Sequence, residues 1–340
     1  MAKQSLAVKY RPKTWDDVSE QEEIKIILQQ QLSNNEIVHG YLFCGPAGCG
    51  KTTAARIFAN EINDGKGNPI ELDAASNNSV EDIRRLIEQA QTQSLDSEYK
   101  VFILDEVHML SNSAWNAFLK TLEEPPAKSI FIMATTDPQK IPATILSRSQ
   151  RYNFQRISTH GIMKRLTHIL HEENIPEVEG GLDAVEYIAK LADGGMRDAI
   201  TLMDKCLSYS TALTLENVVK ALNTVDYATM FKLTDAVASN DKLQVIELIE
   251  DLYNSGKDLK QFIKQYAQFL LDTEKYYIGC DWKYINMPKI TEYRDWLLQM
   301  ADKQDRIQEI LNVIIKLDTE IKYSSTPKYD VEATLIGVCL

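Results

Sequence analysis

The first 155 residues contain short continuous apolar runs, separated by segments in which apolar residues recur every three or four positions. Continuous runs bounded by polar or glycine-rich turns are typical of strands buried on both faces. They cover residues 39–44, 101–104 and 129–134, and a further strand is predicted at 70–73, after the turn at 64–69. The longer spacing predicts amphipathic helices. These cover residues 21–32, 52–62, 79–90 and 113–123. Strands that alternate with helices predict an α/β domain, with a parallel sheet and helices on both of its faces.

The strand pattern ends near residue 154, and only helical periodicity follows. The next helices are predicted at 158–174, 181–192, 196–209 and 215–223. Helical spacing then continues to the end of the chain, interrupted by a turn at 254–256. We therefore expect a small all-helical domain and then a second one, with domain boundaries at 1–157, 158–224 and 225–340.

Composition indicates a folded protein that does not cross a membrane. The 340 residues are 44% hydrophobic, and 37 Lys and Arg against 49 Asp and Glu give a net charge of -12. No apolar run approaches the roughly 20 residues that a bilayer span needs. Residues 1–12 lack the apolar core of a secretory signal, so a cytoplasmic location is expected. The five cysteines form no C-x-x-C pair, which favours free thiols over a disulfide framework or a zinc site.

A glycine-rich turn follows the first predicted strand and matches the pattern G-x-x-x-x-G-K-[ST]. In this pattern backbone N–H groups surround phosphate oxygens at a helix N-terminus, Lys51 reaches the β and γ phosphates, and Thr52 binds Mg²⁺. The candidate phosphate-binding residues are Gly45, Pro46, Ala47, Gly48, Cys49, Gly50, Lys51, Thr52 and Thr53. The alternative, a tight turn without a ligand, would require both the spacing and the strand-to-helix context to be accidental.

Two carboxylates, Asp105 and Glu106, end the apolar strand at 101–104. The carboxyl ends of parallel strands form the edge where ligands bind. Asp105 is expected to hold the metal ion. Glu106 is expected to orient or polarise an attacking water, which hydrolysis requires. The alternative is that the two acidic residues only face solvent at the end of the strand. The phosphate loop earlier in the sequence favours the catalytic interpretation over this alternative.

Seven sequence runs point to one known family. They are Lys9-Tyr-Arg-Pro12, Thr14-Trp-Asp-Asp-Val18, Asp105-Glu-Val-His-Met-Leu-Ser111, Leu119-Lys-Thr-Leu-Glu-Glu-Pro-Pro126, Ala134-Thr-Thr-Asp-Pro-Gln-Lys140, Ile145-Leu-Ser-Arg148 and Gly194-Gly-Met-Arg-Asp198. Together they resemble the gamma/tau subunits of bacterial DNA polymerase III, the motor subunits of the sliding-clamp loader within the AAA+ ATPases. The resemblance covers about residues 5–225. It implies a P-loop AAA+ domain, a helical lid domain and a helical collar domain that oligomerises.

The resemblance assigns roles that spacing alone leaves open. Thr136 falls on the sensor 1 position beside the γ phosphate, where by itself it would be a strand-end threonine. Arg148 falls on the arginine finger, which acts in trans on the neighbouring subunit's site, although a lone arginine after a helix is usually a surface charge. Arg197 falls on sensor 2, which reaches the nucleotide from the lid domain. The residues implied to border the adenine are Tyr10, Arg11, Pro12 and Val18.

The chain departs from the cellular family between residues 61 and 72, where the family carries a zinc module with four cysteines. Zinc is therefore not expected here. The sequence also ends at residue 340 without the long tau extension that binds polymerase and helicase. This compact form resembles the small subunits of replication factor C and of phage clamp loaders, and a phage or mobile-element origin is a hypothesis.

The resemblance implies an ATPase that uses ATP and Mg²⁺ to open a sliding clamp and load it on primer-template DNA. The implied partners are the clamp, the DNA and other clamp-loader subunits, in a homo- or hetero-oligomer of five. Candidate DNA contacts are Arg84, Arg85 and Lys120, for which a solvated helix face is the alternative. Two other functions are weighed: an ATP-binding subunit that supports a complex without turnover, and another DNA-linked AAA+ ATPase such as a Holliday-junction motor or a helicase loader.

Overall fold

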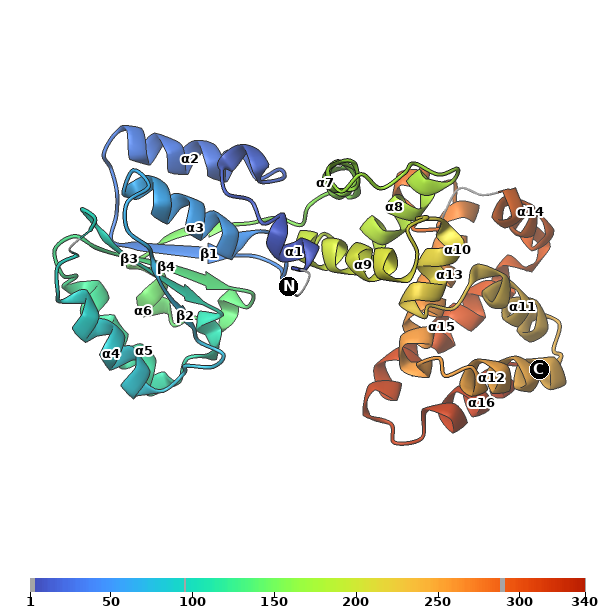
Figure 1. Ribbon diagram of the computed structural model, residues 1–340. Coiled ribbons are helices and arrows are strands. Elements are labelled where there is room, and N and C mark those ends of the chain that lie inside the picture. Colours follow the sequence, from blue (N-terminus) through green and yellow to red (C-terminus); the bar gives the residue numbers. More distant parts are fainter. Residues whose placement is uncertain (1–3, 95, 288–290, 340) are drawn as a thin grey trace. The chain divides into compact units, whose positions relative to one another are not determined.

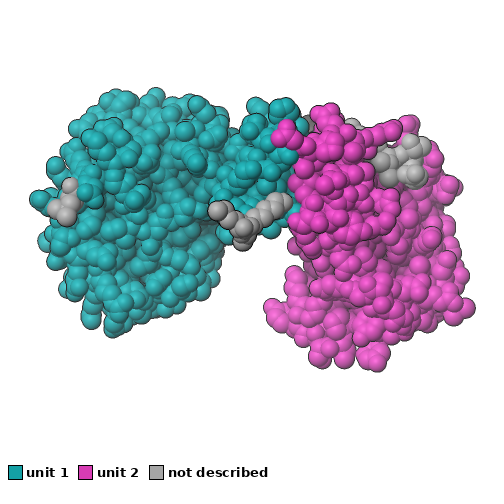
Figure 2. Space-filling model, in the orientation of Figure 1, with its two compact units in different colours: residues 1–173, 191–204 teal, residues 174–190, 205–340 magenta. Residues whose placement is uncertain are grey.

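The computed structural model describes residues 4–94, 96–287 and 291–339 and divides the chain into two compact units. Unit 1 comprises Met1–Glu173 and Leu191–Asp204 (Figure 2). Unit 2 comprises Asn174–Lys190 and Lys205–Leu340. The division falls within α9 (Met196–Tyr209), so the first residues of this helix belong to unit 1.

Unit 1 is built on a parallel five-stranded sheet with the order β2-β3-β4-β1-β5. Figure 1 labels β1, β2, β3 and β4. The strands are β1 (Gly40–Cys44), β2 (Ile70–Asp73), β3 (Lys100–Asp105), β4 (Ser129–Thr135) and β5 (Gln150–Asn153). The predicted parallel sheet is confirmed. The apolar pattern does not predict β5, because every residue of this strand except Tyr152 is strongly polar.

Helices cover both faces of the sheet, as expected (Figure 1). On one face α2 (Glu22–Ser33) and α3 (Lys51–Ile62) pack over a core that includes Phe43 and Phe58. On the other face the core includes Phe118 and Phe131. The helices over that face are α4 (Val80–Ala90), α5 (Asn112–Glu123) and α6 (Ala143–Leu146). A capping box between Ser79 and Asp82 fixes the start of α4.

Four short elements and one longer helix complete unit 1 among its described residues. They are α1 (Leu6–Lys9), η1 (Trp15–Asp17), η2 (Val107–Met109), η3 (Pro138–Lys140) and α7 (Thr159–Glu172). Gln21 ties the chain after β5 to the start of α2, since its amide nitrogen donates to the carbonyl of Gln155 and its oxygen accepts from Gln155 N–H, at 2.7 and 3.1 Å.

Unit 2 is helical throughout its described residues, as the periodicity predicts. Its elements are most of α8 (Gly181–Leu191), the end of α9, α10 (Leu215–Leu222), α11 (Tyr227–Ala238), α12 (Lys242–Asn254), α13 (Leu259–Tyr277), η4 (Trp282–Tyr284), α14 (Thr291–Gln299), η5 (Ala301–Lys303), α15 (Gln304–Glu320), η6 (Ile321–Tyr323) and α16 (Pro327–Val338). An aromatic cluster forms part of its core, with the rings of Phe231 and Trp296 stacked 4.5 Å apart. Among the described helices of the whole chain, none is long and apolar enough to span a membrane.

Candidate nucleotide-binding site

The phosphate loop, residues 45–50, connects β1 to α3 at the carboxyl edge of the sheet. Gly45, Gly48 and Gly50 all have positive φ angles, which glycine adopts without strain. Close packing imposes a second requirement at Gly48. A Cβ atom there would lie only 2.9 Å from the Cα of Gly195. The loop therefore needs glycine both for its turn and for the approach of the segment that precedes α9.

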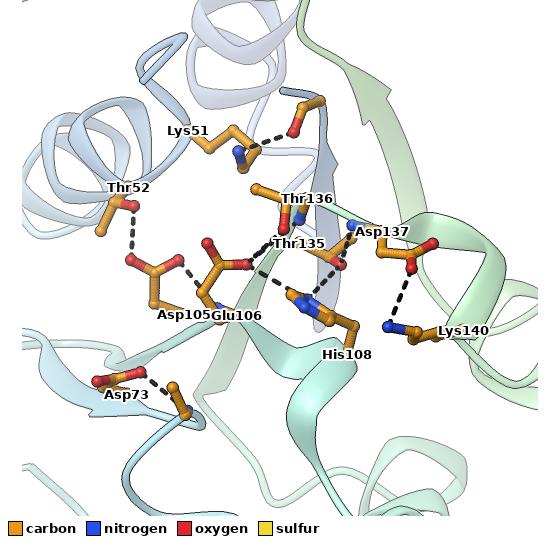
Figure 3. Close-up of polar contacts among 12 residues, drawn as sticks. Lys51, Thr52, Asp73, Asp105, Glu106, His108, Thr135, Thr136, Asp137 and Lys140 are labelled. Carbon is orange, nitrogen blue, oxygen red and sulfur yellow. Dashed lines mark hydrogen bonds and ion pairs between the residues drawn. The ribbon is translucent and has the colours of Figure 1, made fainter. Parts of the chain in front are cut away.

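Lys51 and Thr52 open α3 and face the loop and the end of β3 (Figure 3). The Lys51 ammonium is buried and donates to the carbonyls of Gly45 at 2.9 Å and Pro46 at 2.8 Å. The Thr52 hydroxyl donates to Asp105 Oδ2 at 2.7 Å. A hydroxyl and a carboxylate held together beside a phosphate loop fit Mg²⁺, which takes few protein ligands and completes its shell with water and substrate phosphates.

Glu106 lies at the end of β3, and its side chain meets residues that follow β4 (Figure 3). Its Oε2 accepts from the Thr136 hydroxyl at 3.0 Å and from the Thr136 backbone N–H at 3.4 Å. β3 and β4 are neighbours in the sheet, so their carboxyl ends bring these residues together. Glu106 has a left-handed backbone, with φ 48°, and strained backbone of this kind is concentrated at functional sites.

A cavity of about 500 Å³ opens beside the phosphate loop, within unit 1. Its volume lies in the ordinary range for ligand pockets. The predicted residues that line it are Tyr10, Arg11, Pro12, Val18, Ala47, Gly48, Cys49, Gly50, Lys51, Thr52, Thr53, Asp105, Glu106 and Arg197. Gly45, Pro46 and Thr136 are outside this lining, but each contacts Lys51 or Glu106.

Positive side chains gather on the wall of this cavity. Burial, followed by the charges of Arg56 and Arg197, lowers the pKa of the Arg11 guanidinium, while Glu71 and Asp105 act in the opposite direction. Arg197 is exposed and lies in the first turn of α9. A cavity with such cations suits a polyanionic ligand. Burial also raises the pKa of the Cys49 thiol, so this loop residue is neutral at pH 7.

Several lining residues escape prediction from the sequence. The polar ones include Asp17, Arg165, Asp198, Thr201 and Asp204, and the apolar ones include Ile157, Met196 and Ile200. Arg165 holds the N-terminal segment, since it donates to the Tyr10 carbonyl at 3.0 Å and lies 4.0 Å from Asp17. A single arginine within an amphipathic helix gives no signal of this role. Asp198, by contrast, ends the run 194–198 and could have been proposed from it.

The start of α9 contacts the phosphate loop directly. The Met196 N–H donates to the Gly48 carbonyl at 3.0 Å, and the Ile157 N–H donates to the Gly194 carbonyl at 3.1 Å. These backbone contacts bring Arg197 to the cavity. They depend on the glycines that precede the helix.

The other candidate residues lie away from the cavity lining. Arg148 follows α6, and its guanidinium lies 2.8 Å from Glu123 and donates to the Thr144 carbonyl at 2.8 Å. Arg84 and Arg85 are exposed on α4, and Lys120 is exposed on α5, which packs against α4. The structure therefore groups the phosphate loop, the strand-end acids, Arg11 and Arg197, and separates Arg148 from them.

Comparisons with known proteins identify related chains. Three family models match: the delta subunit of DNA polymerase III over residues 69–158, the ATPase lid domain of a DNA polymerase III clamp loader subunit over 161–212, and domain III of the DNA polymerase III gamma and tau subunits over 213–340. Among solved structures, the RuvB Holliday junction branch migration motor of Thermotoga maritima is 20% identical, with a TM-score of 0.53 over 67% of this chain and 79% of that one. That likeness shows the fold alone.

The curated relatives are subunits of DNA polymerase III. The tau subunit of Bacillus subtilis is 35% identical, and the match covers 100% of this chain and 64% of that subunit. The tau subunit of Escherichia coli is 37% identical, and the match covers 75% of this chain and 43% of that subunit. The chain thus spans less than two thirds of these tau subunits. The gamma subunit of Buchnera aphidicola is 31% identical over 98% of both chains. With this full-length match and the order of the matching domains, the chain belongs to the gamma/tau subunit family of DNA polymerase III.

Proposed function

We propose that this chain is an ATPase motor subunit of a DNA sliding-clamp loader, which hydrolyses ATP to ADP and phosphate. The observation that carries the proposal is the arrangement at the carboxyl edge of the sheet. There, Thr52 bonded to Asp105 adjoins the phosphate loop, and Glu106 bonded to Thr136 adjoins the same cavity. Metal-holding and water-orienting carboxylates beside a phosphate loop are the parts that hydrolysis needs.

Each group has a distinct task in this proposal. Lys51 leaves the loop carbonyls to contact the β and γ phosphates, and Arg197 and Arg11 add positive charge nearby. Thr52 and Asp105 would hold Mg²⁺, which neutralises phosphate charge when bound. Glu106 orients the attacking water, and Thr136 holds the Glu106 carboxylate. Because charge is stabilised by groups already in place, little reorganisation is needed at the moment of reaction.

The base of the nucleotide is assigned to the N-terminal side of the cavity. Tyr10, Pro12 and Val18 line this side. Ile157 and Ile200 line the same cavity and add apolar surface. The Tyr10 hydroxyl is already bonded to Glu173 at 2.7 Å, so the ring rather than the hydroxyl is proposed to meet the base.

The remaining proposals follow the family. The three domains are 1–157, 158–224 and 225–340, and the third is a collar that assembles subunits, with five in the ring. ATP is the nucleotide and no zinc is required. The Cys44, Cys49, Cys206 and Cys339 thiols are buried and free, which supports an ordinary structural role for them. The clamp, primer-template DNA and other loader subunits are the proposed partners.

Steady-state ATP hydrolysis tests the proposed function. We expect the rate of ATP hydrolysis to rise when the chain is combined with partner subunits, its clamp and primed DNA. Assembly would bring the arginine finger of one subunit to the nucleotide site of its neighbour. Junction DNA or a helicase in place of clamp and primed DNA is the matched control. Hydrolysis that ignores clamp and primed DNA would favour a supporting subunit, and a response to junction DNA or helicase would favour another DNA-linked ATPase.

Replacing both Arg84 and Arg85 with glutamine is expected to weaken stimulation by primed DNA. Both side chains are exposed, and phosphate contacts contribute most of sequence-independent DNA affinity. Each lost contact should reduce the slope of log affinity against log salt by about 0.9. Lys66→Gln, an exposed change in the turn before β2, is the control. Unchanged DNA stimulation and salt slope in the double variant would exclude these arginines from the DNA surface.

A further inference from the structure

Two hydrogen-bond donors and an imidazole converge on one oxygen of Glu106. The Thr136 hydroxyl and backbone N–H are 3.0 and 3.4 Å from Oε2, and His108 Nδ1 is 3.3 Å from the same atom (Figure 3). The other oxygen, Oε1, has no hydrogen-bond partner within the described part of the chain. The carboxylate is therefore held asymmetrically, with one oxygen fixed and the other available to a water.

The backbone after β3 brings His108 back beside Glu106. Glu106 takes the left-handed conformation, and the 3-10 turn that follows is closed by the Met109 N–H, which donates to the Glu106 carbonyl at 2.9 Å. The His108 side chain is only 12% exposed. A strained residue followed by a tight turn thus places the imidazole against the carboxylate two residues earlier in the chain.

A second buried group fixes the imidazole from the side of β4. The Thr135 hydroxyl lies 3.2 Å from His108 Nδ1 and accepts from the Asp137 N–H at 3.0 Å (Figure 3). Thr135 is fully buried, so its hydroxyl cannot exchange these partners for bulk water. His108 Nδ1 is consequently located between a fixed hydroxyl and the Glu106 carboxylate.

The chemistry of these groups determines where the proton lies. An ionised carboxylate only accepts hydrogen bonds, whereas either nitrogen of a neutral imidazole can carry the hydrogen. A hydrogen on Nδ1 can be shared between the Thr135 hydroxyl, at 3.2 Å, and Glu106 Oε2, at 3.3 Å, whereas a bare Nδ1 would place a lone pair against the carboxylate. The Nδ1–H form therefore satisfies the observed geometry.

We propose that His108 is a positioning residue for ATP hydrolysis: its Nδ1–H fixes Glu106 Oε2 and so leaves Oε1 to orient the attacking water. This inference rests on the proposed function. His108 does not line the cavity, so its role concerns the hydrolytic step rather than nucleotide affinity. The consequence is specific: kcat depends on a donor at the Nδ1 position, and nucleotide binding does not.

The test compares His108→Asn with His108→Leu in the full chain, assembled with its partner subunits, clamp and primed DNA. The two side chains have the same branching, but only asparagine offers a donor near the Nδ1 position. We expect kcat to fall about 10- to 100-fold in His108→Leu, the size of effect that misplacement of a catalytic group produces. His108→Asn should recover most of this loss, and both variants should bind methylanthraniloyl-ADP as tightly as the unchanged chain.

Two further variants distinguish a failure of the His108 proposal from a failure of the proposed ATPase function. Glu106→Gln sets the baseline rate, and His108→Leu added to it should cause no further loss. His160→Leu, an exposed histidine on α7, is the matched control. Equal rates for His108→Asn and His108→Leu, loss of methylanthraniloyl-ADP binding in His108→Leu, or a further loss in the double variant would each overturn the positioning role. An unchanged chain no faster than Glu106→Gln would instead overturn the proposed ATPase function, and this role with it.

Discussion

Replacement of Arg148 with alanine is expected to lower ATP turnover by the assembled subunits about 10³- to 10⁵-fold, the range by which an arginine finger accelerates related reactions. The guanidinium stabilises charge on the transferred phosphoryl group only when it is presented to a bound nucleotide. Nucleotide binding by the variant itself should be unchanged, because Arg148 is not part of the lining of its own chain's cavity. Hydrolysis and methylanthraniloyl-ADP binding, measured on the same samples, check both statements.

The surroundings of Arg148 indicate that its replacement should affect catalysis without affecting folding. Its partners are Glu123, the Thr144 carbonyl and the Ser147 hydroxyl, all near the surface. Exposed ion pairs contribute only about 0 to 1 kcal/mol to stability, so the alanine variant should fold normally. Arg151→Ala, an exposed arginine on the edge strand β5, is the matched control and should retain turnover.

Mixing variants tests whether the arginine acts between copies. A Lys51→Ala chain cannot hold the phosphates but keeps Arg148, whereas an Arg148→Ala chain keeps its own nucleotide site. Assembled together, they should regain part of the turnover that each lacks alone. An Arg148→Ala chain that hydrolyses ATP normally, or a mixture with no gain over its components, would contradict a finger acting in trans between copies of this chain.

Glu106→Gln is expected to reduce turnover about 10²- to 10⁴-fold, the usual contribution of a group that accepts a proton in the transition state. Glutamine preserves the size and shape of the side chain and leaves the Thr52–Asp105 pair intact. Binding of ATP and Mg²⁺ should therefore persist, and the variant should accumulate in the ATP-bound state. Single-turnover hydrolysis, with ATP binding measured separately, distinguishes loss of chemistry from loss of substrate.

The matched control for Glu106→Gln is Glu124→Gln, an exposed residue just after α5. It changes the net charge of the chain by the same amount and should not affect hydrolysis. If Glu106→Gln retained full activity, another group would have to orient the water. If it lost ATP binding in parallel with turnover, Glu106 would belong to the metal or phosphate site instead.

The parts of the site that are contiguous in sequence could be predicted from residues alone. β1 and β3 are buried on both faces and therefore appear as continuous apolar runs, and the glycine spacing after β1 locates the phosphate loop. The strand β5 could not be found this way, because its residues other than Tyr152 are strongly polar and form no apolar run. Thr136 and Arg148 received roles only through the family resemblance.

Other features of the site depend on contacts between side chains that the fold brings together, and no local sequence pattern predicts these contacts. Arg165 becomes part of the cavity wall because α7 packs against the N-terminal segment, where it contacts Tyr10 and Asp17. The contact of His108 with Glu106 depends on a left-handed residue and a tight turn, and glutamate has no special preference for that conformation. Such contacts follow from the backbone path, so they require the three-dimensional structure.

Gly48 and Gly195 lie so close together that the phosphate loop and the start of α9 depend on each other's position. A methyl group on Gly48 would meet the Gly195 backbone at 2.9 Å, and one on Gly195 would lie 2.9 Å from the Asp198 carboxylate. A side chain at position 48 would push apart two segments that are distant in the sequence, whereas one at position 195 would displace the carboxylate of Asp198, which is three residues away. The phosphate loop cannot accept a side chain at position 48 unless the start of α9 moves away, so a displacement of one of these segments is transmitted mechanically to the other.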